Sequence, residues 1–168
     1  FEQWNIVPDI ELAVMESGQG LNQLLSKLLR QLDKVMSEVN PDCVVVQGDT
    51  SSCLAGALAA FHREIPVYHV EAGLRSQNMT MPEEVNRIIT DRISDILFCP
   101  TKLSVENLQK EGFDKFPVNI EMVGDVMFDT CRHFSKSARK PASVANSSGN
   151  FDYSLITIHR AENTDSKE

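Results

Sequence analysis

The apolar residues of the chain alternate between helical spacing and short continuous runs. From Leu21 to Val39 they recur every three or four positions, which is the spacing of a helix with one buried face. The Pro41-Asp42 step ends that helix, and the continuous Cys-Val-Val-Val run at 43–46 is typical of a strand covered on both faces. The order then repeats, with helices predicted at 51–64, 82–94, about 101–111 and about 125–136, and strands at 66–70, 95–99 and 118–123. This alternation predicts an α/β fold with a Rossmann-like parallel sheet, flanking helices and right-handed crossovers.

The composition changes after Ser137. Residues 138–150 are rich in Ser, Ala and Lys and have no apolar period, which is typical of a linker. The Tyr-Ser-Leu-Ile-Thr-Ile run at 153–158 then predicts a new strand. We therefore expect residues 1–137 to be the later part of a first domain and residues 151–168 to open a second. Because the pattern begins and ends in mid-element, we expect a segment of a longer polypeptide.

Charge and cysteine content limit the function classes. The formal net charge of −8 argues against a nucleic-acid partner, which would require clustered Lys and Arg. No signal segment and no apolar run of membrane-spanning length is present, so we expect no membrane partner. The four cysteines form no Cys-x-x-Cys pair, and we expect free thiols in a reducing, cytoplasmic compartment.

Polar motifs directly follow three of the predicted strands. They are Gln-Gly-Asp-Thr at 47–50, Glu-Ala-Gly-Leu-Arg at 71–75 and His-Arg-Ala-Glu-Asn at 159–163. A fourth motif, Pro-Glu-Glu-Val-Asn-Arg at 82–87, opens the next helix. Because ligands of open α/β sheets bind beyond the carboxyl ends of the strands, we expect these motifs to form one site. Carboxylates beside guanidinium groups indicate acid/base chemistry on a phosphorylated substrate.

The first two carboxylates also have structural interpretations. Asp49 could form a cluster with Thr50 and Ser51 that caps the following helix, although the preceding Gly48 favours close approach by a neighbour or ligand. Glu71 ends a strand of buried character, where a carboxylate must be paired or used. An ion pair with Arg75 or Arg87 is the structural alternative.

The motifs at 82–87 and 159–163 leave similar alternatives open. Glu83 and Glu84 lie in a first helical turn, where the macrodipole favours negative charge in any protein. Arg87, one turn later, can pair with either carboxylate or bind a phosphate. His159 and Arg160 either face a cleft between two domains or form a surface pair.

The remaining histidines are interpreted as structural. His69 precedes Glu71 and is predicted to be a packed, hydrogen-bonded core residue. His62 and His133 are predicted to be solvated or capping residues. Because no His-Glu-x-x-His and no paired Cys and His occur at ligand spacing, we expect no metal site.

In this order, the motifs closely resemble the non-hydrolysing UDP-N-acetylglucosamine 2-epimerase family. The resemblance also includes Val-Gly-Asp-Val-Met-Phe-Asp at 123–129 and runs over nearly the whole chain. It implies two Rossmann-like domains of the glycosyltransferase-B type with the nucleotide-sugar between them. Residues 151–168 would then begin the UDP-binding second domain.

The resemblance implies an isomerase that interconverts UDP-GlcNAc and UDP-ManNAc for cell-surface polysaccharide biosynthesis. Members of the family eliminate UDP to give 2-acetamidoglucal and add it back with C2 inverted. No cofactor and no metal are implied. The family resemblance also implies a homodimer for the full-length protein and, in bacterial members, a second UDP-GlcNAc molecule as an allosteric effector.

Family roles can be transferred to matching positions of this sequence. The catalytic residues would be Asp49, Glu71, Glu83, Arg87 and His159. The substrate-binding residues would be Gly73, Arg75, Arg160 and Glu162. The loop at 76–81 is shorter than in many bacterial members, which affects the expected substrate and effector contacts.

Three other functions are compatible with the same architecture. Two are enzymes, a hydrolysing epimerase that releases ManNAc and UDP and a nucleotide-sugar glycosyltransferase. The third is an inactive, truncated nucleotide-sugar binder. The His-Val-Glu-Ala-Gly-Leu-Arg and Pro-Glu-Glu-Val-Asn-Arg motifs favour the non-hydrolysing branch. We expect the 168-residue segment alone to be inactive.

Overall fold

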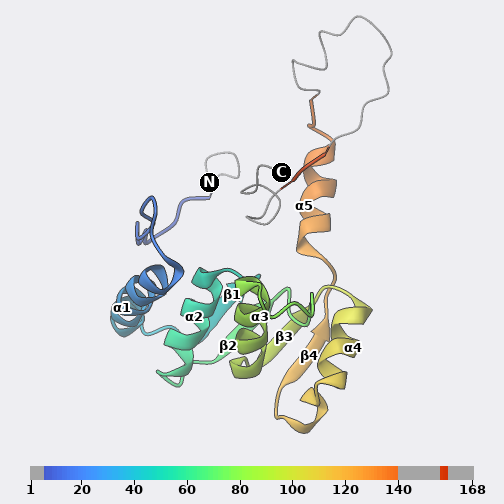
Figure 1. The fold of residues 1–168 in the computed structure, drawn as a ribbon, viewed down its shortest axis with the longest axis horizontal. Helices are drawn as coiled ribbons and strands as arrows, with labels where there is room; N and C mark the ends of the chain where they lie inside the picture. The colour runs from blue at the N-terminus through green and yellow to red at the C-terminus, as the bar shows by residue number, and fades with distance from the viewer. Residues whose placement is uncertain (1–5, 140–155, 159–168) are drawn as a thin grey trace, which may run out of the picture. The chain divides into compact units, whose positions relative to one another are not determined.

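The computed structural model describes residues 6–139 and 156–158, and the chain divides into two compact units at residues 1–130 and 131–168. The first unit contains a four-stranded sheet in the order β1-β2-β3-β4, in which all neighbouring strands are parallel (Figure 1). Its strands are β1 (Val44–Gln47), β2 (Val67–Val70), β3 (Ile96–Cys99) and β4 (Asn119–Met122). The helices are α1 (Leu21–Val39), α2 (Ser51–Phe61), α3 (Pro82–Ile93), α4 (Lys102–Lys110), a 3-10 helix (Phe113–Lys115) and α5 (Val126–Ser135). The predicted α/β class with a parallel sheet is confirmed.

One face of the sheet is buried and the other is partly open. Side chains alternate across a strand, so Val46, His69 and Leu97, which lie side by side in register, point to the same face. All three are buried, whereas Val45 on the other face is 60% exposed. The prediction that the strand at 43–46 is covered on both faces is therefore wrong for the described residues. A continuous apolar run shows that both faces tolerate burial, but it does not identify what covers them.

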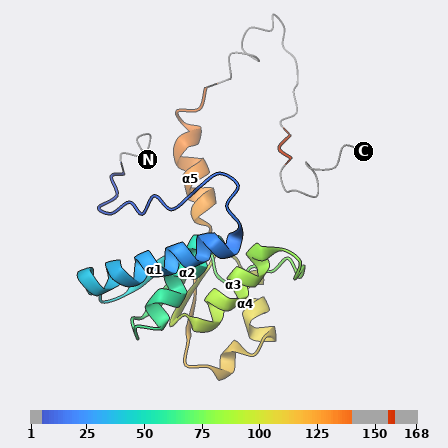
Figure 2. The ribbon, with the colours of Figure 1, turned by 60° about the vertical axis from the view of Figure 1, so that its left-hand side comes forward.

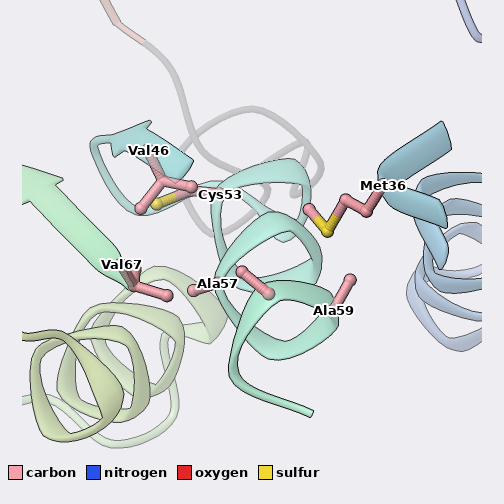
Figure 3. Close-up of a cluster of buried hydrophobic side chains, with 7 residues drawn as sticks. Met36, Val46, Cys53, Ala57, Ala59 and Val67 are labelled. Atoms are coloured by element: carbon pink, nitrogen blue, oxygen red, sulfur yellow. The ribbon is translucent and has the colours of Figure 1, made fainter. Parts of the chain in front are cut away.

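Small side chains allow α2 to pack closely between the sheet and α1. Figure 2 shows α1 lying against α2, and the two helices are in extensive contact. A Cβ added at Gly56 would lie 3.0 Å from Cγ1 of Val46, so a larger residue would push α2 away from β1. The cluster shown in Figure 3 consists of Met36, Val46, Cys53, Ala57, Ala59, Ala60 and Val67.

Most element ends lie within one or two residues of the prediction. The main exception is α2, which ends at Phe61 rather than at residue 64 because residues 62–64 form a turn. In that turn Glu64 has a φ of 58°, which no helix accommodates. The first helix ends at Val39 and is capped by Asn40, whose φ is 48° and whose N–H donates to the Met36 carbonyl.

Two further predictions concern the end of the chain. The predicted strand at 153–158 is described only at residues 156–158, which are not in a strand, and its first half lies outside the described residues. The division into domains at residues 138–150 stays a prediction, because most of that segment also lies outside them. Within the described part of the chain, no helix combines the length and apolar character needed to cross a membrane.

Candidate active site

The loops after β1 and β2 lie side by side at the carboxyl edge of the sheet, as the sequence predicts. The Gly48 N–H donates to the Val70 carbonyl at 3.0 Å, and the Glu71 N–H donates to the Phe98 carbonyl at 3.1 Å. These bonds continue the parallel ladder beyond the strand ends. The backbone therefore holds the loop that carries Asp49 against the loop that carries Glu71.

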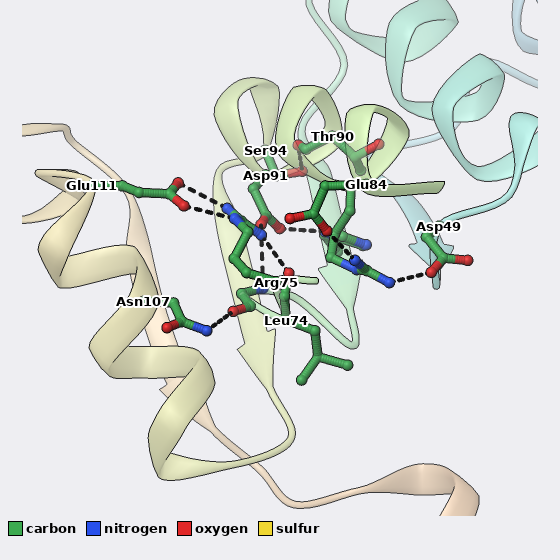
Figure 4. A network of polar contacts seen from close by, with 12 residues as sticks. Asp49, Leu74, Arg75, Glu84, Thr90, Asp91, Ser94, Asn107 and Glu111 are labelled. Atoms are coloured by element: carbon green, nitrogen blue, oxygen red, sulfur yellow. Dashed lines mark hydrogen bonds and ion pairs between the residues drawn. The ribbon is translucent and has the colours of Figure 1, made fainter. Parts of the chain in front are cut away.

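Asp49 is paired with α3 and does not cap α2. The cap is Thr50, whose Oγ1 accepts a hydrogen bond from the Cys53 N–H at 3.3 Å. Asp49 Oδ2 forms an ion pair with Nη2 of Arg87 (Figure 4). Its backbone carbonyl accepts from Nδ2 of Asn86 at 2.9 Å. The interpretation of residues 49–51 as a cluster that caps the helix is therefore correct for Thr50 and wrong for Asp49, whose side chain is directed by α3.

Arg87 also binds Glu84, so one guanidinium joins two carboxylates. Its Nη1 lies 2.8 Å from Glu84 Oε2. Glu84 is 1% exposed and accepts hydrogen bonds from the Ser76 N–H at 2.9 Å and the Gln77 N–H at 2.8 Å. Burial raises the pKa of Glu84, but the two backbone hydrogen bonds and the Arg87 charge outweigh burial and hold the pKa below its ordinary value. Glu84 is thus an ionised anchor for the loop at 76–81.

The structure does not link Glu83 to this network. Glu83 is exposed in the first turn of α3 and forms no hydrogen bond or ion pair with another described residue. Its catalytic role stays a prediction. His159, Arg160 and Glu162 lie outside the described residues, so their predicted roles also stay untested.

Glu71 has an unusual backbone conformation. Its φ of 73° lies in the left-handed region, which is uncommon for a residue with a Cβ. Holding such a residue there costs on the order of 1–3 kcal/mol, and strain of this kind concentrates at functional sites. The conformation directs the side chain of a residue that directly follows the buried end of β2.

The Glu71 carboxyl is half-buried and makes no hydrogen bond or ion pair within the described residues. The alternative of a structural ion pair with Arg75 or Arg87 is therefore wrong here. Burial and the negative charge of Asp49 raise the pKa of Glu71, and Arg87 opposes them only in part. An unpaired carboxyl with a raised pKa is typical of a general acid/base.

Arg75 and Gly73 hold the second loop in place. The Arg75 side chain is 4% exposed, and it forms ion pairs at 2.7 Å with both Asp91 and Glu111 (Figure 4). The Gly73 N–H donates to Asp91 Oδ2 at 3.2 Å, and a Cβ at Gly73 would lie 2.5 Å from the Ser104 carbonyl oxygen. In the described residues, both predicted substrate-binding positions are engaged by protein groups.

Several residues of the site were not predicted. Asp91 lies one helical turn after Arg87, a spacing that could have indicated a shared helix face. Asp125 follows β4, and its Oδ1 accepts from the Met127 N–H at 2.8 Å at the start of α5. Its charge also raises the pKa of Glu71. Nothing in the local pattern identified Glu111, which lies far along the chain from its partner Arg75.

An apolar groove in the described residues does not coincide with these carboxylates. Its volume is about 850 Å³, it lies between residues 11–15, α1 and β1, and most of its lining is apolar. The groove contains neither Asp49 nor Glu71. The candidate active site is therefore defined by the carboxylates and their contacts, and not by the groove.

No three His, Cys, Asp or Glu side chains are grouped to hold a metal ion in the described part of the chain. The free cysteines are Cys43, Cys53, Cys99 and Cys131.

Two relatives of this chain are 2-epimerases of UDP-sugars. The family model for UDP-N-acetylglucosamine 2-epimerase matches residues 1–168. The chain is 47% identical over 166 residues to a UDP-2,3-diacetamido-2,3-dideoxy-D-glucuronate 2-epimerase of Pseudomonas aeruginosa, covering 98% of this chain and 46% of that protein. It is 42% identical over 173 residues to a UDP-N-acetylglucosamine 2-epimerase of Methanocaldococcus jannaschii, covering 100% of this chain and 46% of that protein.

A solved structure agrees with the sequence comparisons. The crystal structure of the Methanocaldococcus jannaschii UDP-GlcNAc 2-epimerase in complex with UDP-GlcNAc and UDP superposes with a TM-score of 0.86 at 43% identity. The superposition covers 99% of this chain and 46% of that chain. The chain thus spans about half the length of these relatives. On the family match, the identities and the shared fold, the chain belongs to the UDP-N-acetylglucosamine 2-epimerase family.

Proposed function

We propose that the whole protein interconverts UDP-GlcNAc and UDP-ManNAc through elimination and re-addition of UDP. The observation that carries the proposal is Glu71, a half-buried carboxyl with a raised pKa and no partner among the described residues. Family membership supports the reaction class. The solved relative that was crystallised with UDP-GlcNAc and UDP supports the substrate class.

The chemistry requires two acid/base groups. The C2 proton has no adjacent carbonyl, so cleavage of the C1–O bond comes first, and its electron pair leaves on the UDP oxygen. A carboxylate then takes the C2 proton, and the C–H electron pair becomes the C1=C2 double bond of 2-acetamidoglucal. In the reverse step a carboxylic acid returns a proton to the opposite face of C2 while UDP rejoins C1. Each face of C2 therefore requires its own proton carrier.

The described residues can fill part of this set. We assign proton exchange at one face to Glu71, because a carboxyl with a raised pKa holds and releases a proton closer to neutral pH. Asp49, oriented by Arg87, is suited to stabilise the positive charge that develops at C1. Glu83 and His159 complete the catalytic set in the proposal.

Besides His159, two residues beyond the described ranges are included in the proposal. Arg160 and Glu162 are assigned to the nucleotide side, on the family resemblance alone.

The test is proton NMR of the full-length protein with UDP-GlcNAc in deuterated water. We expect deuterium at C2 of both UDP-GlcNAc and UDP-ManNAc, because every reversal of the elimination takes its proton from solvent. Free ManNAc as the product would identify a hydrolysing epimerase. Absence of C2 deuterium and of any product would identify an inactive binder.

One comparison provides a second candidate substrate. The Pseudomonas aeruginosa relative, at 47% identity, acts on UDP-2,3-diacetamido-2,3-dideoxy-D-glucuronate. That sugar carries a carboxylate at C6 and a second acetamido group at C3. In the described residues, Arg75 and Arg87 are both already paired with carboxylates, which favours the uncharged hexosamine as the first substrate to test. The ratio of kcat/KM for the two sugar nucleotides decides between them.

A further inference from the structure

His69 lies between the two loops that carry Asp49 and Glu71. It is fully buried on β2, with Nε2 at 2.8 Å from the Gly48 carbonyl oxygen and Nδ1 at 2.7 Å from Asp91 Oδ1. A carbonyl oxygen only accepts hydrogen bonds, so Nε2 carries a proton. The protonation of Nδ1 depends on the state of Asp91.

Asp91 has the contacts of an ionised carboxylate. Its Oδ2 accepts from Nη1 of Arg75 at 2.7 Å and from the Gly73 N–H at 3.2 Å. A carboxylate with these donors accepts from Nδ1 of His69 as well, so both ring nitrogens are protonated and the imidazole is a cation. Burial lowers the pKa of His69, but the hydrogen bonds to Asp91, Cys53 and the backbone, with the Asp91 charge, raise it to about 10.

Each member of the pair holds one loop. His69 binds the carbonyl of Gly48, which has a φ of 76° and immediately precedes Asp49. Asp91 binds the backbone of Gly73, two residues after Glu71. The ion pair therefore fixes the two loops relative to each other through contacts on the buried face of the sheet.

We propose that the buried His69–Asp91 ion pair is a positioning element that sets the relation between the Asp49 and Glu71 carboxylates. The inference rests on the proposed function, because it assigns these two carboxylates to the reaction. His69 is a positioning residue and not a catalytic one, since its ring is fully buried and both nitrogens bind protein groups.

The charges around Glu71 determine the sign of the effect. Asp49 and Asp125 raise its pKa, whereas Arg87 and His69 lower it. Around His69 itself, the facing groups are Asp91 on α3, the Cys53 thiol on α2 and the Gly48 carbonyl, with Arg75 beyond Asp91. Removal of the imidazolium charge therefore raises the pKa of Glu71 further.

The test compares full-length His69→Gln with His62→Gln, a control at an exposed histidine at the end of α2. In His69→Gln we expect kcat to fall about 10- to 100-fold while KM changes less than about 3-fold, because a misplaced acid/base group affects the chemical step more than binding. The limb of the pH–rate profile set by Glu71 should move to higher pH, whether Glu71 acts as acid or base. The control should match the wild type in both measurements.

A spectroscopic measurement keeps the proposal testable if His69→Gln does not fold. In the wild-type protein labelled with ¹⁵N-histidine, the His69 ring should show two protonated nitrogens at pH 8. A neutral ring at that pH would overturn the proposal, and so would a folded His69→Gln with unchanged kcat and pH profile. If the wild type itself fails to exchange C2 deuterium, the proposed function is refuted. The ring measurement then still decides whether the buried ion pair exists.

Discussion

At the scale of single residues, the site is defined by which carboxylates are paired and which is not. Asp49 and Glu84 share Arg87, and Asp91 and Glu111 share Arg75. Glu71 lies among these groups without a hydrogen bond or ion pair to a described residue. Half-burial and a positive φ both cost free energy of folding at this position. A functional role for the unpaired carboxyl accounts for that cost.

The first prediction concerns the chemistry of Glu71. In the full-length protein, Glu71→Gln should lower kcat by about 10²- to 10⁴-fold, because an amide cannot exchange a proton with C2. UDP binding, measured by calorimetry, should stay within about 2-fold of the wild type. Glu38→Gln, on the exposed surface of α1, serves as the control. Near-normal turnover of Glu71→Gln would remove this residue from the reaction.

A second prediction uses Asp125, whose charge raises the pKa of Glu71. Asp125→Asn keeps an oxygen that can cap α5 but removes the negative charge. The pKa of Glu71 should then fall, and the limb of the pH–rate profile that it sets should move to lower pH. Because Asp125 is exposed, the shift should shrink as ionic strength rises. A shift toward higher pH, or one insensitive to salt, would contradict this electrostatic account.

The sequence predicted Asp49 and Glu71 because each carboxylate lies in the polar motif that follows an apolar strand. It could not predict their partners. Arg75 bonds to Glu111, 36 positions away, and such a pair depends on how α4 packs beside the loop. Of the two acidic residues at the start of α3, the family resemblance implied a catalytic role for Glu83, and the pattern alone did not separate it from Glu84. The structure connects Glu84 to Arg87, because helical geometry turns only one of the two inward.

At the scale of elements, α3 provides one polar face to both loops. Glu84→Gln should destabilise the full-length protein by about 1–3 kcal/mol, because an amide offers one acceptor oxygen to three donors. The folded-state pKa of Glu84 is lowered, so its stabilisation is present above the ordinary pKa of glutamate and is lost as pH falls through the lowered value. Urea unfolding should therefore show a difference from wild type at pH 7 that shrinks in acid. The neighbouring Glu83→Gln should change stability by less than about 0.5 kcal/mol.

The contact between the second loop and α4 leads to a matched pair of glycine variants. Gly73 and Gly112 have φ values of 77° and 80°, but only at Gly73 would a Cβ meet a backbone atom, at 2.5 Å. Gly112→Ala should cost about 1–2 kcal/mol for the left-handed conformation alone. Gly73→Ala should cost about 3 kcal/mol or more, because the Ser104 carbonyl cannot move without shifting α4. Equal losses in urea unfolding of the full-length protein would show that the close approach does not matter.

At the scale of the whole molecule, the fold class could be predicted, but the covering of the sheet could not. Alternating strands and helices specify a parallel sheet whatever lies beyond it. In the described residues, α2, α3 and α4 contact the sheet, and Val45 is left 60% exposed on the other face. Parallel sheets are normally buried on both faces. This chain also spans only about half the length of the relatives compared with it.

The last prediction follows from the fact that the chain covers only about half the length of these relatives. Residues 1–168, expressed alone, should not incorporate deuterium at C2 of UDP-GlcNAc under conditions in which the full-length protein does. The described residues supply Asp49 and Glu71, but the proposed reaction also needs a group at the second face of C2 and a holder for UDP. Exchange by the isolated chain that is abolished by Glu71→Gln would contradict this and would show that residues 1–168 carry out the elimination by themselves. Exchange that survives Glu71→Gln would instead indicate a contaminating enzyme, so the variant is the necessary control for either result.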